Sequence, residues 1–377
     1  MIRILHISDV HLGARLGGFD GAAAERREAI RAAFRGLPER ANALEIDAVL
    51  VAGDLFDGTR PAAADVDVAR EVLRALAADG RPVVAIPGNH DAALTADSPW
   101  RAMPDVVTTI LEPRFGDPVT LTPRGGECAL HVYGIAYDPT VEPAPIGAYR
   151  RSQAPGVHVV LLHAGVADHP DWTGGASLRT TTAELAGLDA DYIALGDYHG
   201  HRPPGEFGGP PACYCGSFAA VAVDELGPRG CAVVELEPGA PPRVRLDPSP
   251  VPALVDLGSL DVSDAGDELE AAERVGARLG DANSHPVVTL TGEPAFPLDV
   301  DRVRDALRER YGFAVVRDET RFIDSAHVRT LAGQPTIAGH VARLGLERRD
   351  AAAGDAARAE AERALRLALR ALEVESP

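Results

Sequence analysis

The sequence contains no lysine, so all 37 of its basic side chains are arginine, and 56 acidic side chains outnumber them. The resulting formal net charge of −19 argues against a chain that coats nucleic acid by bulk electrostatic attraction. Any binding of phosphate groups must therefore be local, through metal ions or a few arginines. Arg15, Arg150 and Arg151 are candidates for such contacts, although solvated surface arginine is the default interpretation of each.

Cysteine and long apolar runs are also scarce. The four cysteines, Cys128, Cys213, Cys215 and Cys231, lack the CxxC spacing of a zinc ribbon, and we expect buried thiols in a reducing compartment. No apolar run approaches the roughly 18 residues of a membrane-spanning helix. The N-terminus enters a strand-like pattern at once and lacks the order of a signal peptide, so we expect a cytoplasmic protein.

Short, β-branched, apolar segments in the N-terminal half indicate buried strands. Helical patterns lie between them, around residues 30–37 and 61–76. This alternation predicts a layered α/β core. The expected strands are Ile2–Ile7, Ile46–Ala52, Pro82–Ile86, Leu130–Ile135, Val157–Leu162 and Tyr192–Leu195.

The C-terminal part has a different pattern. Further strands are expected at Tyr214–Ala222, Gly230–Leu236 and Arg243–Leu246. A Pro-rich stretch and then a β-α-β pattern at 286–318 follow. In the tail, Ala356–Glu373 favours a helix, with a narrow apolar stripe at Leu365, Leu369 and Leu372. We therefore expect a main domain at 1–237, a linker at 238–260, a capping domain at 261–350 and a C-terminal helix at 351–377.

Five polar clusters follow apolar strands directly. They are Asp9-Val10-His11, Gly53-Asp54-Leu55-Phe56-Asp57, Gly88-Asn89-His90-Asp91, His163, and Gly196-Asp197-Tyr198-His199. The carboxyl ends of strands in an α/β sheet meet at one edge, where ligands bind, so we expect the clusters to converge. Each cluster alone is ordinary turn chemistry. Their joint occurrence at strand ends indicates a functional site.

The side chains in these clusters are oxygen and imidazole donors. Such donors suit Mn²⁺, Fe²⁺ or Zn²⁺ better than a purely hard Ca²⁺ site or a thiolate site. A carboxylate such as Asp54 can bridge two ions, which together can activate a water for attack on a phosphoryl group. His90 can protonate the leaving oxygen or stabilise charge in the transition state, and Asp91 can orient that imidazole. We therefore predict His90 and Asp91 as catalytic residues beside a pair of divalent ions.

The order DxH…GDxxD…GNHD…H…GxxH resembles the calcineurin-like metallophosphoesterase superfamily. HISDVHLG, GDLFD and the segment Tyr214-Cys215-Gly216-Ser217 are similar to its DNA-repair exonuclease branch, the bacterial SbcD-type nuclease subunits. The resemblance is specific over residues 1–235 and weaker beyond them. It implies a four-layer α-β-β-α sandwich with a small α+β capping domain and a C-terminal helix.

The same resemblance implies two metal sites and two kinds of partner. The implied ligands are Asp9, His11, Asp54 and His199 for one ion, and Asp54, Asn89, His163 and Asp197 for the other. Mn²⁺ is the expected ion, with Fe or Zn as alternatives. His90 would be the catalytic histidine, and the capping domain would orient DNA. The C-terminal helix would dock on a coiled-coil ABC-type ATPase, and a homodimer is a further candidate assembly.

The last motif departs from the family pattern. The family has Gly-His-x-His, whereas this chain has Gly196-Asp197-Tyr198-His199. A carboxylate at 197 can still bind a metal, but it adds negative charge and hardens the site. We expect Asp197 as the ligand. Two alternatives stay open: His201 replaces it through a loop shifted by two residues, or Asp197 only hydrogen-bonds to a ligand.

Three functional hypotheses follow. The leading one is a Mn²⁺-dependent DNA exonuclease or endonuclease subunit in DNA repair, whose partner ATPase supplies most of the DNA-binding surface. The main alternative is a stand-alone phosphoesterase of small phosphodiesters or phosphomonoesters. The third is a structural subunit whose metal site is weakened by Asp197.

Overall fold

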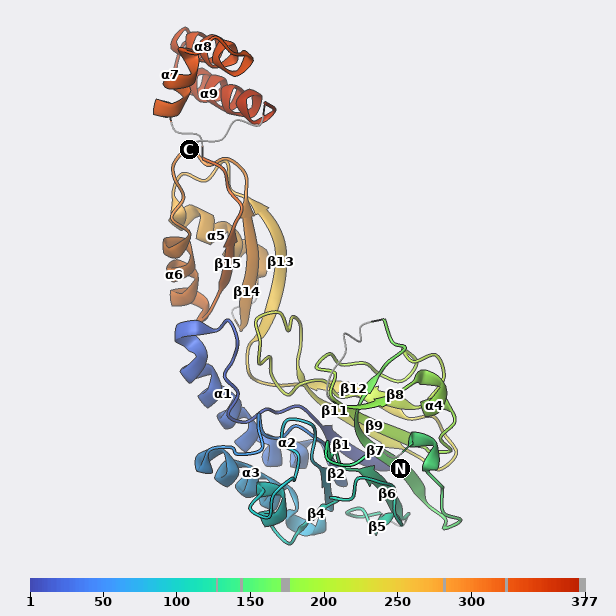
Figure 1. The fold of residues 1–377 in the computed structure, drawn as a ribbon. Helices are drawn as coiled ribbons and strands as arrows, with labels where there is room; N and C mark the ends of the chain where they lie inside the picture. Colours follow the sequence, from blue (N-terminus) through green and yellow to red (C-terminus); the bar gives the residue numbers. More distant parts are fainter. Residues whose placement is uncertain (127, 143–144, 171–176, 281–282, 323–324, 373–377) are drawn as a thin grey trace. The chain divides into compact units, whose positions relative to one another are not determined.

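The computed structural model describes residues 1–126, 128–142, 145–170, 177–280, 283–322 and 325–372. The chain divides into two compact units, Met1–Ala253 and Leu254–Pro377 (Figure 1). Among the described helices, none combines the length and the apolar character needed to cross a membrane.

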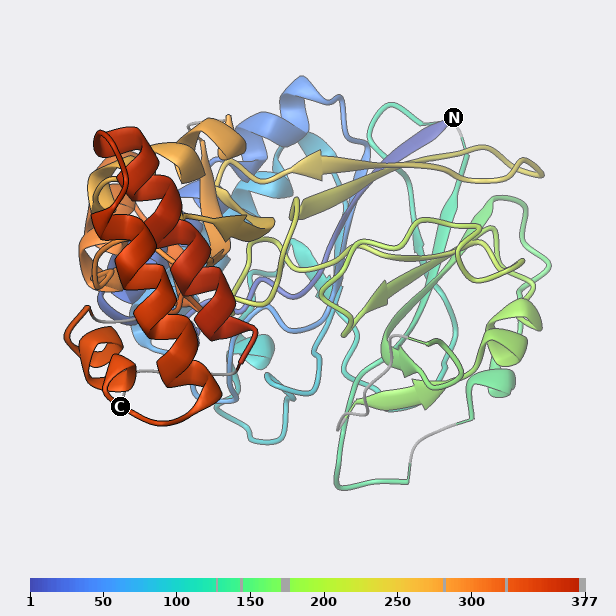
Figure 2. The ribbon, with the colours of Figure 1, turned by 90° about the horizontal axis from the view of Figure 1, so that it is seen from above.

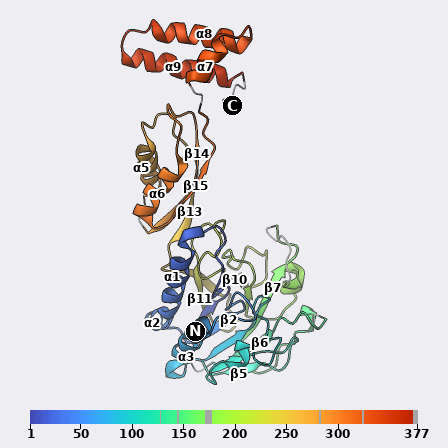
Figure 3. The same ribbon diagram turned by 60° about the vertical axis from the view of Figure 1, so that its left-hand side comes forward.

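A six-stranded sheet forms one half of the first unit, in the order β12-β11-β1-β2-β3-β4. Strands β1 to β4 are mutually parallel, and β11 and β12 extend the sheet antiparallel beyond β1. The strands are β1 (Ile2–Ile7), β2 (Ala48–Ala52), β3 (Val83–Ile86), β4 (Val107–Thr109), β11 (Gly230–Leu236) and β12 (Arg243–Pro248). Along one side of this sheet lie α1 (Ala23–Arg35), α2 (Leu37–Ala43) and α3 (Ala63–Leu76) (Figures 1 and 3).

A second sheet forms the other half of the first unit, in the order β10-β9-β7-β6-β5. Its strands are β5 (Val119–Leu121), β6 (Leu130–Ile135), β7 (Val157–Val166), β9 (Tyr192–Gly196) and β10 (Ala212–Tyr214). The short β8 (Leu178–Thr180) pairs with the end of β7, and α4 (Thr182–Ala186) follows it. Single 3-10 turns occur at Asp20–Ala22, Ala78–Gly80, Pro99–Ala102 and Ile146–Ala148.

The two sheets pack face to face through apolar side chains. Ile4 and Leu50 of the first sheet share one buried cluster with Val132, Val159 and Leu161 of the second. A second cluster covers the outer face of the second sheet, where Leu185 of α4 packs against Val160 and Ile193. The first unit is therefore an α/β sandwich, as expected from its alternating elements.

Most strands of the first unit lie where the sequence predicts them. β1 and β6 have the predicted bounds, whereas β7 continues to Val166 because its last residues pair with β8. The predicted strand Tyr214–Ala222 is wrong, since β10 ends at Tyr214. Beyond it Gly216 takes a φ of 86°, which extended strands do not allow, and the chain turns back toward the loop after β9.

The second unit begins with a three-stranded sheet, β13 (Ala253–Asp261), β14 (Ser284–Thr291) and β15 (Val315–Asp318), in that order. The helices α5 (Glu268–Leu279) and α6 (Val300–Tyr311) pack on it through Val275, Val303 and Leu307. The predicted β-α-β pattern corresponds to β14, α6 and β15. Residues 238–260, the predicted linker, include β12 and most of β13, so this segment is largely strand.

Three helices end the described chain: α7 (Ser325–Ala332), α8 (Ile337–Asp350) and α9 (Asp355–Arg370). They lie side by side (Figures 2 and 3). The predicted tail helix is α9, and its predicted last residue, Glu373, lies outside the described residues. Leu365 and Leu369 of the predicted stripe are buried against Val328, Leu331 and Ala342, whereas Leu372 lies beyond α9 and is 39% exposed. Two of the three leucines therefore close the core of this small bundle.

We expect Leu50→Ala to lower the free energy of unfolding of the first unit by about 2–5 kcal/mol, because it leaves a cavity between the sheets. Trp100 is buried in this unit, so urea unfolding monitored by tryptophan fluorescence, in the presence of a metal chelator, reports on it. The control is Val106→Ala at a half-exposed side chain, with an expected change within about 0.5 kcal/mol. Equal effects of the two substitutions would contradict the core assigned here.

Candidate metal centre

The predicted clusters come together where strands of both sheets end. β1 leads to Asp9 and His11, β2 to Asp54, and β3 to Asn89 and His90. From the second sheet, β9 leads to Asp197 and His199. His163 lies inside β7 rather than after it, paired with Gly196 of β9. The site therefore lies along the seam between the two sheets.

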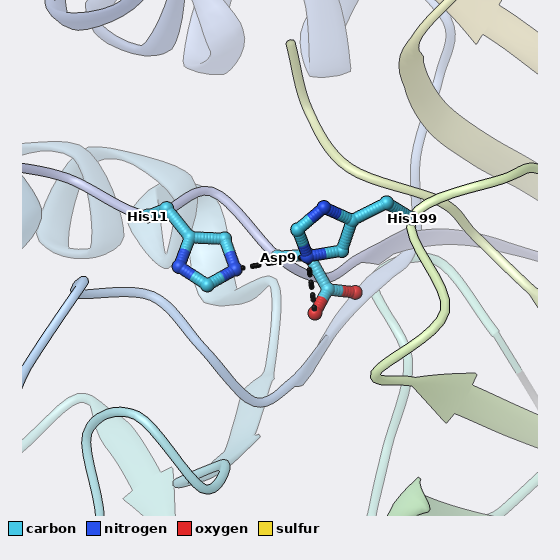
Figure 4. Close-up of side chains that lie close together, drawn as sticks. All are labelled: Asp9, His11 and His199. Atoms are coloured by element: carbon cyan, nitrogen blue, oxygen red, sulfur yellow. Dashed lines mark hydrogen bonds and ion pairs between the residues drawn. The ribbon is translucent and has the colours of Figure 1, made fainter. Parts of the chain in front are cut away.

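One group of ligand atoms consists of Asp9, His11 and His199 (Figure 4). His11 Nε2 lies 3.1 Å from His199 Nε2, which is 3.9 Å from Asp9 Oδ1. His11 Nε2 is also 3.7 Å from Asp54 Oδ2. Two imidazole nitrogens and carboxylate oxygens that converge in this way form the donor set that a divalent transition metal prefers.

A second group surrounds His163. Its Nε2 lies 2.9 Å from Asn89 Oδ1, 3.4 Å from Asp54 Oδ2 and 3.8 Å from Asp197 Oδ1. Asp9 also contributes, because Asp9, Asp54 and His163 bring one ligand atom each within 4.8 Å of one another. Asp54 thus faces histidines of both groups through the same oxygen.

The outer nitrogen of each of these three imidazoles has a protein acceptor. Nδ1 of His11 lies 3.1 Å from Asp57 Oδ1, Nδ1 of His199 lies 2.8 Å from Glu225 Oε1, and Nδ1 of His163 lies 2.8 Å from the Ala52 carbonyl oxygen. In the neutral rings these acceptors hold the proton on Nδ1 and leave the Nε2 lone pair directed into the cluster. The residues present therefore fit a pair of bound cations.

The electrostatics of the cluster also favour cations. Burial opposes ionisation of Asp54, yet the charge of His163 and its hydrogen bond hold the Asp54 pKa well below the usual range. Burial favours neutral His199, but the hydrogen bond to Glu225 and the charge of Asp9 raise its pKa to about 9. The pKa of His163 is likewise raised, against the effect of burial, by the charge of Asp54. Divalent ions would displace these protons and take over their role.

Several of these residues sit on strained backbone. Asp9, His11 and Asp54 have φ values of 50°, 47° and 49°, and Asp197 has a φ of 101°. Such values are uncommon for residues other than glycine, and they cluster at functional sites. These positive φ values lie at the loops that follow the strands, where the metal-ligand candidates stand.

Two glycines allow the loops to approach closely. A Cβ at Gly53, whose φ is 87°, would overlap the His163 ring, and a Cβ at Gly88 would overlap the Asp54 carboxylate. The GDxxD and GNHD motifs thus require glycine because a neighbouring ligand occupies the space of its side chain.

His90 lies at the edge of the cluster, with a side chain 46% exposed. Its ring packs edge-on against His11, with centroids 4.8 Å apart, and its backbone N–H donates to Asp54 Oδ1 at 3.0 Å. His90 Nδ1 lies 3.8 Å from Asp57 Oδ1. His90 is therefore the site histidine best placed to reach a substrate.

Asp91 does not occupy the place expected for a residue that orients His90. It is buried, and its carboxylate accepts hydrogen bonds from the backbone N–H groups of Gly88 and Phe56 at 2.7 and 3.1 Å. Burial and the charge of Asp54 raise the pKa of Asp91 to about 7. Through these hydrogen bonds Asp91 links the GNHD loop to the GDLFD loop. The carboxylate next to His90 is instead that of Asp57.

The two candidates in the last motif have different surroundings. Asp197 lies beside His163, and its backbone N–H donates to Asp9 Oδ1 at 3.2 Å. His201 instead hydrogen-bonds through Nδ1 to the Cys215 carbonyl oxygen at 3.2 Å. Neither residue belongs to the three His and carboxylate groups that the described residues form, so Asp197 as a ligand stays a prediction.

Two carboxylates of the site, Asp57 and Glu225, are not among the residues predicted from the sequence. Asp57 stands in the GDLFD motif, where its spacing was noted but no role was assigned. Glu225 lies 26 positions after His199, in a loop with no recognisable motif, so no local pattern could have identified it. The expected buried thiols are confirmed for Cys213, Cys215 and Cys231, all of them free.

A sandwich of two sheets with a pair of histidine–carboxylate groups at its seam is the architecture of a metal-dependent phosphoesterase. The chain belongs to the calcineurin-like phosphoesterase family, whose model matches residues 2–219.

Relatives within this family include two DNA double-strand break repair proteins named Mre11. The one from Haloferax volcanii is 29% identical over 88% of this chain and 70% of that protein. The one from Aeropyrum pernix is 44% identical over 26% of this chain and 23% of that protein. A further relative is the SbcD component of the nuclease SbcCD from Rhodobacter capsulatus, which is 29% identical over 67% of this chain and 71% of that protein.

We expect Gly88→Ala to weaken Mn²⁺ binding about ten- to a hundredfold, because the new methyl group displaces the Asp54 carboxylate at a cost of about 1–3 kcal/mol. Isothermal titration calorimetry on metal-free protein measures the effect. The matched control is Gly58→Ala, since a methyl group at Gly58 meets no atom within 4 Å. Unchanged affinity in Gly88→Ala would show that Asp54 does not need its present position.

Proposed function

We propose that the chain is a Mn²⁺-dependent DNA nuclease subunit that hydrolyses phosphodiester bonds by a two-metal mechanism in DNA repair, together with a coiled-coil ABC-type ATPase. One observation carries the proposal: Asp54 Oδ2 lies within 3.7 Å of His11 Nε2 and within 3.4 Å of His163 Nε2. This is the arrangement of a carboxylate that bridges two ions. The names of the relatives support DNA as the substrate.

The proposed ligands form two sets that share Asp54. Asp9, His11 and His199 complete the first set, and Asn89, His163 and Asp197 complete the second. When bound, two such ions supply Lewis acidity and a water of lowered pKa. Nitrogen and oxygen donors without thiolate favour Mn²⁺ over softer ions, and the extra carboxylate of Asp197 strengthens this preference.

His90 is the proposed catalytic residue. Its half-exposed imidazole can reach a substrate oxygen, unlike the buried His11 and His163. It would protonate the leaving oxygen or stabilise the charge of the transition state. Asp57 lies near its Nδ1 and would orient the ring, while Asp91 would hold the loop that carries it.

The two parts of the chain would have different roles. Residues 1–237 would form the nuclease domain, and residues 261–350 would orient DNA. The net charge of −19 favours a partner that supplies most of the DNA-binding surface. The same charge is the observation in favour of the alternative function, a stand-alone phosphoesterase of small phosphodiesters or phosphomonoesters. The cytoplasmic location and the homodimer stay predictions.

Docking of the ATPase would use the outer face of the C-terminal helices. Leu365 and Leu369 of the predicted stripe are buried within the bundle, so only Leu372 of that stripe stays exposed. Large apolar side chains remain exposed on α8 and α9, at Ile337, Leu344 and Leu367. Exposed apolar surface of this kind is typical of protein interaction sites.

We expect Asp54→Ala to abolish the binding of both ions and nearly all hydrolysis, because the shared ligand is lost. His90→Ala should keep two bound Mn²⁺ per chain but lower turnover about 10²–10⁴-fold. Metal content by mass spectrometry, with hydrolysis of a DNA substrate and of bis-p-nitrophenyl phosphate, measures both effects. The control is His340→Ala at an exposed histidine of α8. Equal metal loss in the two site variants would contradict the role of His90.

We expect the double substitution Leu344→Arg and Leu367→Arg to release a co-expressed coiled-coil ATPase, because it places two charges on the proposed docking face. Metal content and hydrolysis of bis-p-nitrophenyl phosphate should not change. Co-purification of the two proteins gives the readout. The control is Leu269→Arg on α5, which is also exposed, at 62%. Retention of the ATPase by the double variant would contradict docking on this face, and the failure of the wild-type chain to bind any such ATPase would favour the stand-alone enzyme.

A further inference from the structure

The segment Tyr214-Cys215-Gly216-Ser217 has no role in the mechanism so far, yet it lies directly behind the metal ligands. The hydroxyl of Tyr214 donates to the Ala164 carbonyl oxygen at 2.6 Å and accepts from the Val166 N–H at 3.1 Å. Both partners lie on β7 just after His163. Tyr214 therefore ties the end of that strand to β10.

The loop after β10 binds the backbone of two ligands of the first metal site, His199 and Asp9. The Ser217 N–H donates to the His199 carbonyl oxygen at 2.9 Å, and the Arg229 guanidinium donates to the same oxygen. The Phe218 N–H donates to the Asp9 carbonyl oxygen at 3.2 Å. Gly216 makes this approach possible, because a Cβ there would lie 2.9 Å from the His199 oxygen.

The loop also holds the imidazole of His199, through Glu225. One carboxylate oxygen, Oε1, lies 2.8 Å from His199 Nδ1. The other, Oε2, accepts from the Ser217 hydroxyl at 3.0 Å and from the Val221 N–H at 3.2 Å. The Glu225 side chain is only 12% exposed, so three hydrogen bonds in a mostly dry environment fix the carboxylate. Its position then fixes the ring of His199.

We propose that Glu225 is a positioning residue of the first metal site. By accepting the Nδ1 proton it sets the tautomer of His199 and directs the Nε2 lone pair toward Asp9 and His11. Its negative charge also makes the imidazole a stronger donor to a cation. This inference rests on the two-metal site of the proposed function, and it adds a residue that would touch neither the metal nor the substrate.

Glu225 and Asp57 each accept a hydrogen bond from Nδ1 of a ligand histidine, but substitution of Glu225 is the more specific test of this role. Asp57 serves His11 in the corresponding way, but it also lies 3.8 Å from the proposed catalytic His90. Glu225 contacts His199 and its own loop, so its loss should affect the first ion alone. The second ion keeps His163, whose Nδ1 is held by the Ala52 carbonyl oxygen.

The test is a titration of Mn²⁺ into the full metal-free chain. Isothermal titration calorimetry measures the affinity of each binding step, and electron paramagnetic resonance monitors the bound ions. Glu225→Ala should weaken one of the two binding steps about 10–100-fold and leave the other unchanged. For Glu225→Ala, the electron paramagnetic resonance spectrum at one Mn²⁺ per chain should be that of a single uncoupled ion. Magnetic coupling between two ions should also be absent at a moderate excess of Mn²⁺. Glu225→Gln keeps an acceptor oxygen but removes the charge, so its loss of affinity should be smaller.

The matched control is Asp224→Asn, which removes one negative charge from the same loop at an exposed position. Its two binding steps should equal those of the wild type. Circular dichroism tests whether each variant is folded. If Glu225→Ala does not fold, the Mn²⁺ titration of Glu225→Gln is the test of the inference.

Wild-type affinity at both steps in a folded Glu225 variant overturns the inference, and so does an equal loss at both steps. A wild-type chain that binds fewer than two Mn²⁺ overturns the two-metal function instead. The two failures are therefore distinguishable.

Discussion

The structure depends on the burial of several carboxylates and imidazoles in one small volume at the seam of two sheets. Asp9 and Asp54 are buried, and His163 is fully buried beside them. Buried carboxylates are costly unless positive charge or hydrogen-bond donors compensate them. Here the shifted pKa values of the histidines express the same demand for positive charge that a pair of divalent ions would meet. The electrostatics of the site therefore favour the binding of cations.

The rest of the first unit holds these groups against their mutual repulsion. Parallel strands of both sheets end at the seam, and hydrogen bonds cross it, from His163 to the Ala52 carbonyl oxygen and from the Asp197 N–H to Asp9. Strained backbone at Asp9, His11 and Asp54 is tolerated because the packed sheets beneath it are rigid. The same rigidity keeps the acceptors of each outer imidazole nitrogen in place, including Glu225 from a distant loop.

The charge of the chain and the charge of its site point in the same direction. An acidic protein with a cluster of buried carboxylates attracts metal ions. Large apolar side chains are also exposed on α8 and α9, and such exposure is typical of protein interaction sites.

The sequence by itself determined the fold class, the strands that lead to the site and the polar clusters at their ends. These features are local: a run such as Ile2–Ile7 followed by Asp9 and His11 carries its periodicity and its donors within a few residues. Only the tertiary structure decided which partners the donors have. Asp91 accepts hydrogen bonds from backbone N–H groups, and Glu225 reaches His199 across 26 positions. Two leucines of α9, Leu365 and Leu369, are buried against α7 and α8. These outcomes depend on packing between distant segments, which no local pattern encodes.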